Sequence, residues 1–246
     1  MQYRHHFLSP ELLKSELITL KSASAHHLLN VLRVKVGENI ILLNGLGEGW
    51  VAEVESTQGK ELVLRRVDRA VLPPEPDLKI TVAQAIGKGD KLEEVIQHGT
   101  EIGASRFIPL LTERTIVRLD QKAAEDKRTR WQAISVNAAE QSHRSIPPEV
   151  ALPAKFRESI QSQAGMKLLL DPTGEPLLGF KTELVRSWSA GVALYVGPEG
   201  GWSSPEIEIA REHGAKIVSV GEYVLRTETA ALAAAAQAFA LYRLCE

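Results

Sequence analysis

The chain has 246 residues, of which 44% are hydrophobic and 24% charged, and its net charge is −2. These values are ordinary for a globular protein, exclude a polycation, and at this length favour two domains. The single cysteine, Cys245, excludes an intramolecular disulfide and any multi-cysteine metal site, and neither a membrane span nor a signal peptide is recognisable, so we expect a cytoplasmic protein.

The first 72 residues predict a small β-barrel. Short apolar runs alternate with turn signals, including a glycine-rich hairpin at 44–49. A short helix is expected over 24–34, with Ser24 as its N-cap. Three prolines within 71–77 indicate a stiff linker, because proline continues neither a helix nor an inner strand. We therefore expect one domain over 1–72 and a second over 73–246.

Beyond the linker, apolar runs alternate with helical patterns, which is typical of an α/β fold with a parallel sheet covered on both faces. The expected strands are 79–85, 106–111, 167–171, 192–196 and 216–220. One helix should begin after Asp90, an N-cap with Glu93 three residues on, and stop at Gly103. Further helices are expected over 126–141 and over the alanine-rich segment 227–245.

The stretch 194–208, LYVGPEGGWSSPEIE, ends a strand in glycines and enters a helix at once. Ser203 and Glu206 have the spacing of a capping box, and ligands of α/β sheets bind beyond such strand ends. A phosphate is disfavoured, because no phosphate-loop or dinucleotide motif is present and Glu199 would repel it. The carboxylate is compatible with a cationic or hydroxyl-rich ligand. The alternative is a purely structural turn.

A second segment, 218–234, also leaves a strand through a glycine and enters a helix through Thr227 or Thr229. We expect these two strands to be adjacent, with the strand end at 168–175 as a third wall. Three such loops around one pocket suit a nucleoside held by main-chain and apolar contacts.

The two glycine-containing segments together resemble the paired knot motifs of SPOUT-class RNA methyltransferases. The resemblance is closest to the ribosomal RNA small subunit methyltransferase E family and extends over nearly the whole chain. RHHFL, HHLLNVLRVKVGE and NGLGEGWVAEV resemble its N-terminal PUA-like barrel. KGDKLEEVIQHGTEIG, ERTIVRL and RWQAISVNAAEQSHRSIPPEV resemble its middle section.

This resemblance implies an α/β domain with a deep trefoil knot, an exception to the usual rule against threaded chains. It also implies a homodimer whose interface holds the S-adenosyl-L-methionine pocket. The reaction would be methylation of N3 of a uridine in small-subunit (16S) ribosomal RNA, free or in the assembled subunit. The cofactor-binding residues would be Leu169, Leu170, Gly197, Glu199, Gly200, Gly201, Val220, Gly221, Leu225, Thr227 and Thr229.

For catalysis, Arg226 and Glu199 are the candidates. Methylation of N3 requires loss of an imide proton, and a fixed cation near the uridine oxygens would stabilise the resulting anion. Arg226 is that candidate, or else it ties the fold together through Glu228 or a helix C-terminus. The general base is open among Glu199, Glu140 and solvent.

For RNA binding, the residues that match family motifs are Arg4, Arg33, Arg114, Gln141 and Arg144. Each arginine is otherwise an ordinary surface residue, and Gln141 otherwise belongs to a solvated helix end. Between residues 113 and 144 lie seven basic and five acidic residues, Arg118 among them, and from charge alone a solvated helix surface is favoured. The pairs His5–His6 and His26–His27 are interpreted as RNA-facing or structural, with no metal, since no cysteine or acid has ligand spacing from them.

Two other classes compete with a methyltransferase. A non-catalytic RNA-binding protein of ribosome assembly has no need of both intact loops, at 197–201 and 221–229. A nucleotide-dependent enzyme on a doubly wound fold is disfavoured by the missing phosphate motifs. The three classes differ in the ligand expected: S-adenosyl-L-methionine, no small ligand, or a phosphorylated nucleotide.

Overall fold

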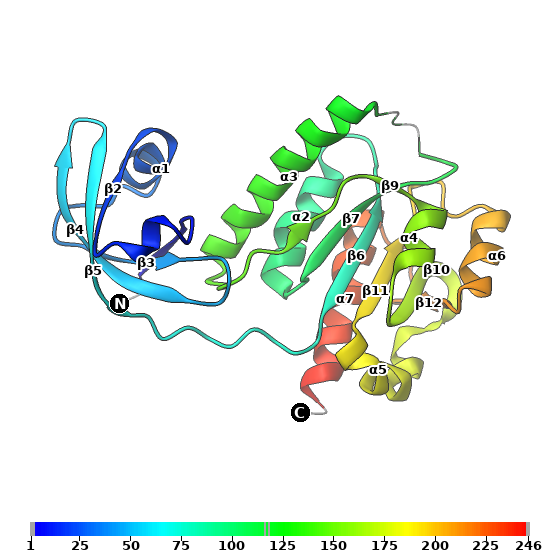
Figure 1. Cartoon of the computed structure of the whole chain (residues 1–246). Helices are drawn as coiled ribbons and strands as arrows, with labels where there is room; N and C mark the ends of the chain where they lie inside the picture. The colour runs from blue at the N-terminus through cyan, green and yellow to red at the C-terminus, as the bar shows by residue number, and fades with distance from the viewer. Residues whose placement is uncertain (1–2, 116, 118, 245–246) are drawn as a thin grey trace. The chain divides into compact units, whose positions relative to one another are not determined.

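The computed structural model describes residues 3–115, 117 and 119–244, which form two compact units (Figure 1). The first unit combines the described residues up to Glu75 with the later segment Ala139–Pro147. The second consists of Pro76–Ala138 and the described residues from Pro148 onward. Cutting the chain once, at residue 72, would leave 139–147 in the second domain. Its ion pairs with first-unit residues group it instead with the first unit. Arg118 and Cys245 lie outside the described residues.

The first unit contains a five-stranded sheet in the order β1-β3-β4-β5-β2. Its strands are β1 (Arg4–Phe7), β2 (Leu17–Leu20), β3 (Asn39–Leu43), β4 (Gly49–Gln58) and β5 (Glu61–Arg69). The β1–β3 pair is parallel and the others are antiparallel, with the expected glycine-rich turn joining β3 to β4. Alternate residues, such as Ile18 and Leu20 of β2, are buried in one core. This alternation is the period of a strand with one covered face.

Short helical segments accompany this sheet: η1 (Leu12–Lys14), α1 (Ser22–His26) and the π-helical turn η2 (His27–Val31). The expected helix is therefore present, but Ser24 does not cap it. Because α1 starts only two residues after β2 ends, Ser24 lies inside the helix. The proline-rich segment that follows β5 has no regular secondary structure up to Pro76, as expected.

The second unit is built on a seven-stranded sheet in the order β12-β10-β11-β6-β7-β8, with β9 also paired to β7. The strands are β6 (Ile80–Ala85), β7 (Arg106–Leu111), β8 (Glu149–Val150), β9 (Ala154–Lys155), β10 (Met166–Pro176), β11 (Val192–Val196) and β12 (Lys216–Ser219). Every pairing is parallel. All residues of β6 and β11 are buried, which explains their continuous apolar sequences. The predicted α/β architecture is confirmed.

Helices cover both faces of this sheet (Figure 1). They are α2 (Lys91–Ile102), α3 (Gln121–Gln141), α4 (Phe156–Ser162), α5 (Lys181–Ser187), α6 (Ser204–Glu212) and α7 (Thr227–Arg243), with the short turns η3 (Leu177–Phe180) and η4 (Trp188–Ala190). Adjacent strand residues enter different cores: Leu168 packs in the cluster that includes α2 and α7, and Leu169 in the cluster of α4 and α6. No described helix is both long and apolar enough to cross a membrane.

In the second unit, α2 begins directly after Asp90, as predicted, and the predicted ends at Gly103 and Ser203 are confirmed. Gly103 ends α2 with φ +119°, a left-handed conformation, and its N–H donates to the carbonyls of Gly99 and Thr100. Ser203 and Glu206 form the predicted capping box at the start of α6. Asp90, however, makes no side-chain cap. Its backbone is not extended, as an N-cap requires, and its carboxylate lies near Arg130, 3.9 Å from a guanidinium nitrogen.

Candidate functional site

A cavity of about 370 Å³ lies at the carboxyl ends of β11 and β12 and beside residues 170–172 in the middle of β10. Its walls are those residues of β10 and the segments that follow β11 and β12, together with the start of α7 and Lys91 of α2. From the sequence we expected the two glycine-containing segments to leave adjacent strands. They do not, because β10 lies between β11 and β12. The central strand therefore supplies the third wall, and the cavity occupies the edge where α/β sheets bind ligands.

The loop after β11 is held in place by Trp202. This buried side chain donates from Nε1 to the carbonyl oxygen of Leu170 over 3.0 Å, which joins the loop to the end of β10. A side chain at Gly197 would lie 3.1 Å from the Trp202 ring. Gly201 has φ +70°, a conformation that favours glycine. The glycines therefore let the backbone fold tightly around one wall of the cavity.

A closer backbone approach occurs at Gly174, where β10 shifts its register against β12. A Cβ atom at this position would lie 2.6 Å from the backbone nitrogen and carbon of Val218. Such a separation is shorter than any tolerated carbon contact, so only glycine fits. Val218 also lines the cavity, and the crossing of these two strands thus fixes part of its wall.

An ion pair lies at the edge of the cavity. Lys91 Nζ is 2.7 Å from Glu199 Oε1 and 3.8 Å from Glu228 Oε2. The hydrogen bond from Lys91 lowers the pKa of Glu199, and the same bond with Glu199 raises the pKa of Lys91. The Glu199 carboxylate is therefore held ionised beside the cavity. Sequence reasoning missed Lys91, because it precedes Glu199 by 108 residues and no local pattern links the two.

The structure brings most of the expected pocket residues together. The expected residues that line the cavity are Leu170, Gly197, Glu199, Gly201, Val220, Gly221, Leu225, Arg226 and Thr227. Three others do not line it: Leu169 faces the opposite core, Gly200 lines a neighbouring cavity, and Thr229 lies exposed in the first turn of α7. Strand geometry explains why Leu169 points away from the cavity while Leu170 lines it, since neighbouring residues of a strand point to opposite faces. Further lining residues, which were not among the predicted cofactor-binding residues, include Asp171, Trp202, Ser219 and Tyr223.

Arg226 occupies the N-cap position of α7 and is exposed. Within the described part of the chain, its guanidinium makes no hydrogen bond or ion pair. The alternative role, a tie to Glu228, is not what the structure shows, because Glu228 lies near Lys91 and accepts a hydrogen bond from Thr227. A cation at the wall of the cavity is thus free to contact a ligand.

A second cavity, of about 400 Å³, adjoins the same loop. It shares Pro198 and Glu199 with the first and is also lined by Gly200, Lys88 and Arg114. The Arg114 guanidinium donates to the carbonyl oxygen of Gly200. One loop therefore separates two cavities, and each of them is lined by two cationic side chains, Lys91 and Arg226 in the first.

The expected RNA-facing residues of the first unit differ in their contacts. Arg4 is half-exposed and pairs with Glu38 at 2.8 Å. Arg33 is exposed and has φ +52°, uncommon for a residue with a side chain, while Gln141 is exposed at the end of α3.

Arg144 instead forms a largely buried ion pair with Glu75, at 2.8 Å. Burial raises the pKa of Glu75, but the hydrogen bond and charge of Arg144, with the N–H groups of Ile146 and Ser145, outweigh it and leave that pKa lowered. This ion pair fixes the segment 139–147 within the first unit.

Comparison with known proteins identifies the class. Residues 74–238 match the family described as RNA methyltransferase domain, and residues 20–65 match the RNA methyltransferase PUA domain. Together with the fold and the cavity, these matches place the chain among the RNA methyltransferases.

Individual relatives identify the family within this class. The chain is 37% identical over 239 residues to the ribosomal RNA small subunit methyltransferase E of Synechocystis, covering 95% of this chain and 76% of the relative. Its Bacillus subtilis counterpart is 32% identical over 220 residues, covering 87% and 86%. The crystal structure of this enzyme from Neisseria gonorrhoeae, bound to S-adenosyl methionine, superposes with a TM-score of 0.89 at 33% identity and covers 98% of both chains. The chain belongs to the ribosomal RNA small subunit methyltransferase E family.

Proposed function

We propose that the chain transfers a methyl group from S-adenosyl-L-methionine to N3 of a uridine in small-subunit ribosomal RNA. The observation that carries the proposal is the cavity at the ends of β11 and β12 and beside the middle of β10, with Glu199 and Arg226 in its walls. Support comes also from the family membership and from the relative whose structure holds S-adenosyl methionine.

The lining fits the cofactor. Apolar residues such as Leu170, Val220 and Leu225 form surfaces for a flat purine ring, and the backbone of the glycine loops offers hydrogen bonds to its edge. The carboxylate of Glu199 complements a positive sulfonium group, and its lowered pKa keeps it ionised at neutral pH. When bound, the cofactor supplies the methyl group.

Arg226 is the proposed catalytic residue. Transfer to N3 forms a nitrogen–carbon bond while the sulfur–methyl bond of the donor breaks and leaves a neutral thioether. The imide proton must also depart, so negative charge spreads onto the uridine oxygens. A guanidinium stays charged and can donate to two oxygens at once, which stabilises that charge in the transition state. Its exposed position, with no competing carboxylate among the described contacts, leaves it available for this role.

The two carboxylates considered as general bases are poorly suited to that task. Glu199 is held ionised by Lys91, and a carboxylate with a lowered pKa is a weak base at neutral pH. Glu140 is buried in the first unit, where it accepts a hydrogen bond from the N–H of Phe7. We therefore propose that Glu199 acts electrostatically on the cofactor and that solvent accepts the imide proton.

We further propose that the first unit binds the RNA, using Arg4, Arg33 and Gln141, and that Arg114 adds a contact beside the catalytic loop. Arg144 would act indirectly, by holding its segment against Glu75. The knot and the homodimer with a pocket at its interface, both drawn from the family, complete the proposal, together with the cytoplasmic location expected from the sequence.

The test is methyl transfer from labelled S-adenosyl-L-methionine to unmodified small-subunit RNA, offered both as a transcript and as reconstituted subunits. Nucleoside analysis should recover N3-methyluridine from one of these substrates. Label in another base or in ribose would contradict the proposed atom. No label on either substrate, with RNA still bound, would favour the non-catalytic RNA-binding protein.

A further inference from the structure

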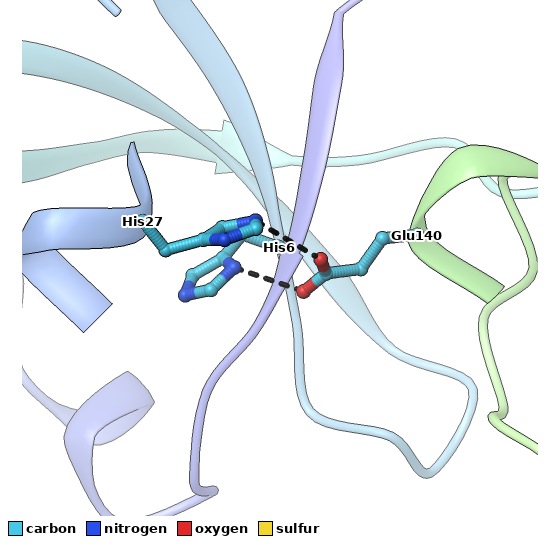
Figure 2. Close-up of side chains that lie close together, drawn as sticks. All are labelled: His6, His27 and Glu140. Carbon is cyan, nitrogen blue, oxygen red and sulfur yellow. Dashed lines mark ion pairs between the residues drawn. The ribbon is translucent and has the colours of Figure 1, made fainter. Parts of the chain in front are cut away.

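His6, His27 and Glu140 form a compact group in the first unit (Figure 2). His6 Nδ1 lies 2.8 Å from Glu140 Oε1, and His27 Nε2 lies 3.7 Å from Glu140 Oε2. One ligand atom from each residue lies within 4.8 Å of the other two. From the sequence we expected no metal, because no acid has ligand spacing from the histidine pairs. The fold supplies Glu140, which follows His6 by 134 residues.

The polar atoms of His6 are incompletely satisfied. His6 is 8% exposed and Glu140 5%. Both ring nitrogens of His6 are buried and have no well-directed hydrogen bond to any described residue, although Nδ1 lies close to the carboxylate. A buried polar atom without a partner destabilises a folded protein, so such an arrangement calls for a bound partner. A cation held between Nδ1 and the carboxylate would satisfy one of these atoms.

The ligand chemistry matches that of zinc. Two imidazoles and one carboxylate are an established ligand set for Zn²⁺, in which three protein ligands leave the fourth position open. Zinc–ligand bonds of about 2.0–2.1 Å in a tetrahedral site place two donor atoms about 3.3 Å apart. This distance lies between the His6–Glu140 and His27–Glu140 separations of 2.8 Å and 3.7 Å. The His6 and His27 rings are stacked, with an interplanar angle of 20°, so binding requires one ring to turn. The side chain of His27 is 30% exposed, which leaves it room to do so.

The carboxylate is also oriented as metal ligands usually are. The backbone N–H of Phe7 donates to Glu140 Oε1 over 2.9 Å, from the residue next to His6. Hydrogen bonds of this kind fix ligating carboxylates and tune metal affinity.

We propose that His6, His27 and Glu140 bind one Zn²⁺ ion per chain, with water in the fourth position. The ion joins β1, the η2 turn and the end of α3, and so fixes the segment 139–147 within the first unit. This role is independent of the methyl-transfer chemistry in the second unit. The competing explanation for the same geometry is an ion pair between a protonated histidine and Glu140, with no metal.

The experiment is a calorimetric titration of the untagged full-length protein with ZnCl₂, after removal of metals by a chelator. Wild-type protein should bind one Zn²⁺ per chain, and its thermal unfolding temperature should rise with Zn²⁺. His27→Ala should lower the affinity at least about 100-fold, since losing even a hydrogen-bond partner of a ligand costs about 10–100-fold. His26→Ala, which removes the exposed neighbouring imidazole, is the matched control and should bind like wild type.

A second variant and a second metal provide independent checks of the same site. Glu140→Gln keeps the size of the side chain and should also lose the site. Co²⁺ in the wild-type protein should give the visible absorption of a low-coordinate site, absent in His27→Ala. The proposal is overturned if wild-type protein binds no stoichiometric Zn²⁺, or if His27→Ala binds it as tightly as His26→Ala. If Glu140→Gln fails to fold, the His27→Ala and His26→Ala pair decides alone.

Discussion

The cavity of the second unit and the histidine–glutamate group of the first are built in opposite ways. Backbone and apolar side chains of three neighbouring strands and the loops after them form the cavity, and its charged groups, among them Lys91, Glu199 and Arg226, are at least partly exposed. The group in the first unit consists of three polar side chains, two of them almost fully buried. The shape of the cavity depends on how closely backbone segments approach one another. In the histidine–glutamate group, each of the three side chains would supply one ligand of the proposed zinc site. Substitutions should therefore act differently in the two regions.

The largest effect is expected at Arg226. Arg226→Ala should reduce methyl transfer at least about 10²–10³-fold, the usual cost of losing one donor to developing negative charge. Affinity for S-adenosyl-L-methionine should stay within a few-fold, because the backbone and apolar walls are unchanged. Radiolabel transfer and calorimetry measure the two quantities separately. Arg211→Ala, which removes an exposed arginine from α6, is the control and should keep full activity. Loss of cofactor binding in Arg226→Ala would show that this arginine builds the pocket instead.

The next effect concerns the backbone crossing behind the cavity. Gly174→Ala would place a methyl group 2.6 Å from the backbone of Val218, where no flexible side chain can yield. The free energy of unfolding should fall by about 1–3 kcal/mol or more, as is typical of overpacking. Urea unfolding measures the change. At Gly179 a Cβ would meet nothing within 4 Å, so Gly179→Ala should be nearly neutral. Equal stabilities of the two variants would mean that the β10–β12 crossing can relax.

A smaller effect, on pH dependence, is expected at His5, whose ring lies 4.1 Å from that of His143. Burial, with the charge of His143, lowers the pKa of His5 to about 4 from its ordinary 6.5. As pH falls below about 6.5, the His5 imidazole becomes protonated in the unfolded chain but stays neutral in the folded chain until about pH 4. Stability from this group is thus complete above about pH 6.5 and is lost progressively down to about pH 4.

His5→Asn should therefore lose less thermal stability than wild type between pH 7 and pH 5. The wild-type protein, measured over the same pH range, is the reference. Identical slopes for wild type and His5→Asn would show that His5 is as accessible to protons when folded as when unfolded.

The smallest effect is expected at the edge of the cavity. Lys91→Met should raise the pKa of Glu199 toward the ordinary carboxyl value, since the hydrogen bond from Lys91 is the main cause of its lowering. The stabilisation from this ion pair is present above the ordinary carboxyl pKa and is lost as pH falls through the lowered value. Carbon NMR titration of the Glu199 carboxyl measures the shift. Lys88→Met should change it less, because Lys88 acts only through its charge; an equal change in both variants would contradict the assignment.

Much of the second unit could be predicted from the sequence because its signals are local. Continuous apolar runs correspond to buried parallel strands, and Ser203 with Glu206 and Gly103 mark helix ends through neighbouring residues. The cavity loops were recognisable because glycines in short spacing report local backbone conformation. Asp90 shows the limit even here: a favourable residue type does not ensure the backbone angles that capping needs.

What could not be predicted depends on separations of many residues. The position of β10 between β11 and β12 is a property of the whole sheet, and the pairing of Lys91 with Glu199 depends on the pairing of β6 with β11. Likewise, Glu140 joins His6 and His27 only because segment 139–147 belongs to the first unit. No spacing along the chain encodes such a group, so the residues were seen separately and their common site was missed.

The most direct test of the central claim is calorimetric titration of the purified protein with S-adenosyl-L-methionine, with ATP and NAD as controls and with small-subunit RNA both absent and present. A cavity with apolar walls, glycine loops and the Glu199 carboxylate should give saturable binding of S-adenosyl-L-methionine alone. Binding of ATP or NAD instead, or of none of the three even with RNA present, would contradict the assignment of this cavity to a methyl donor.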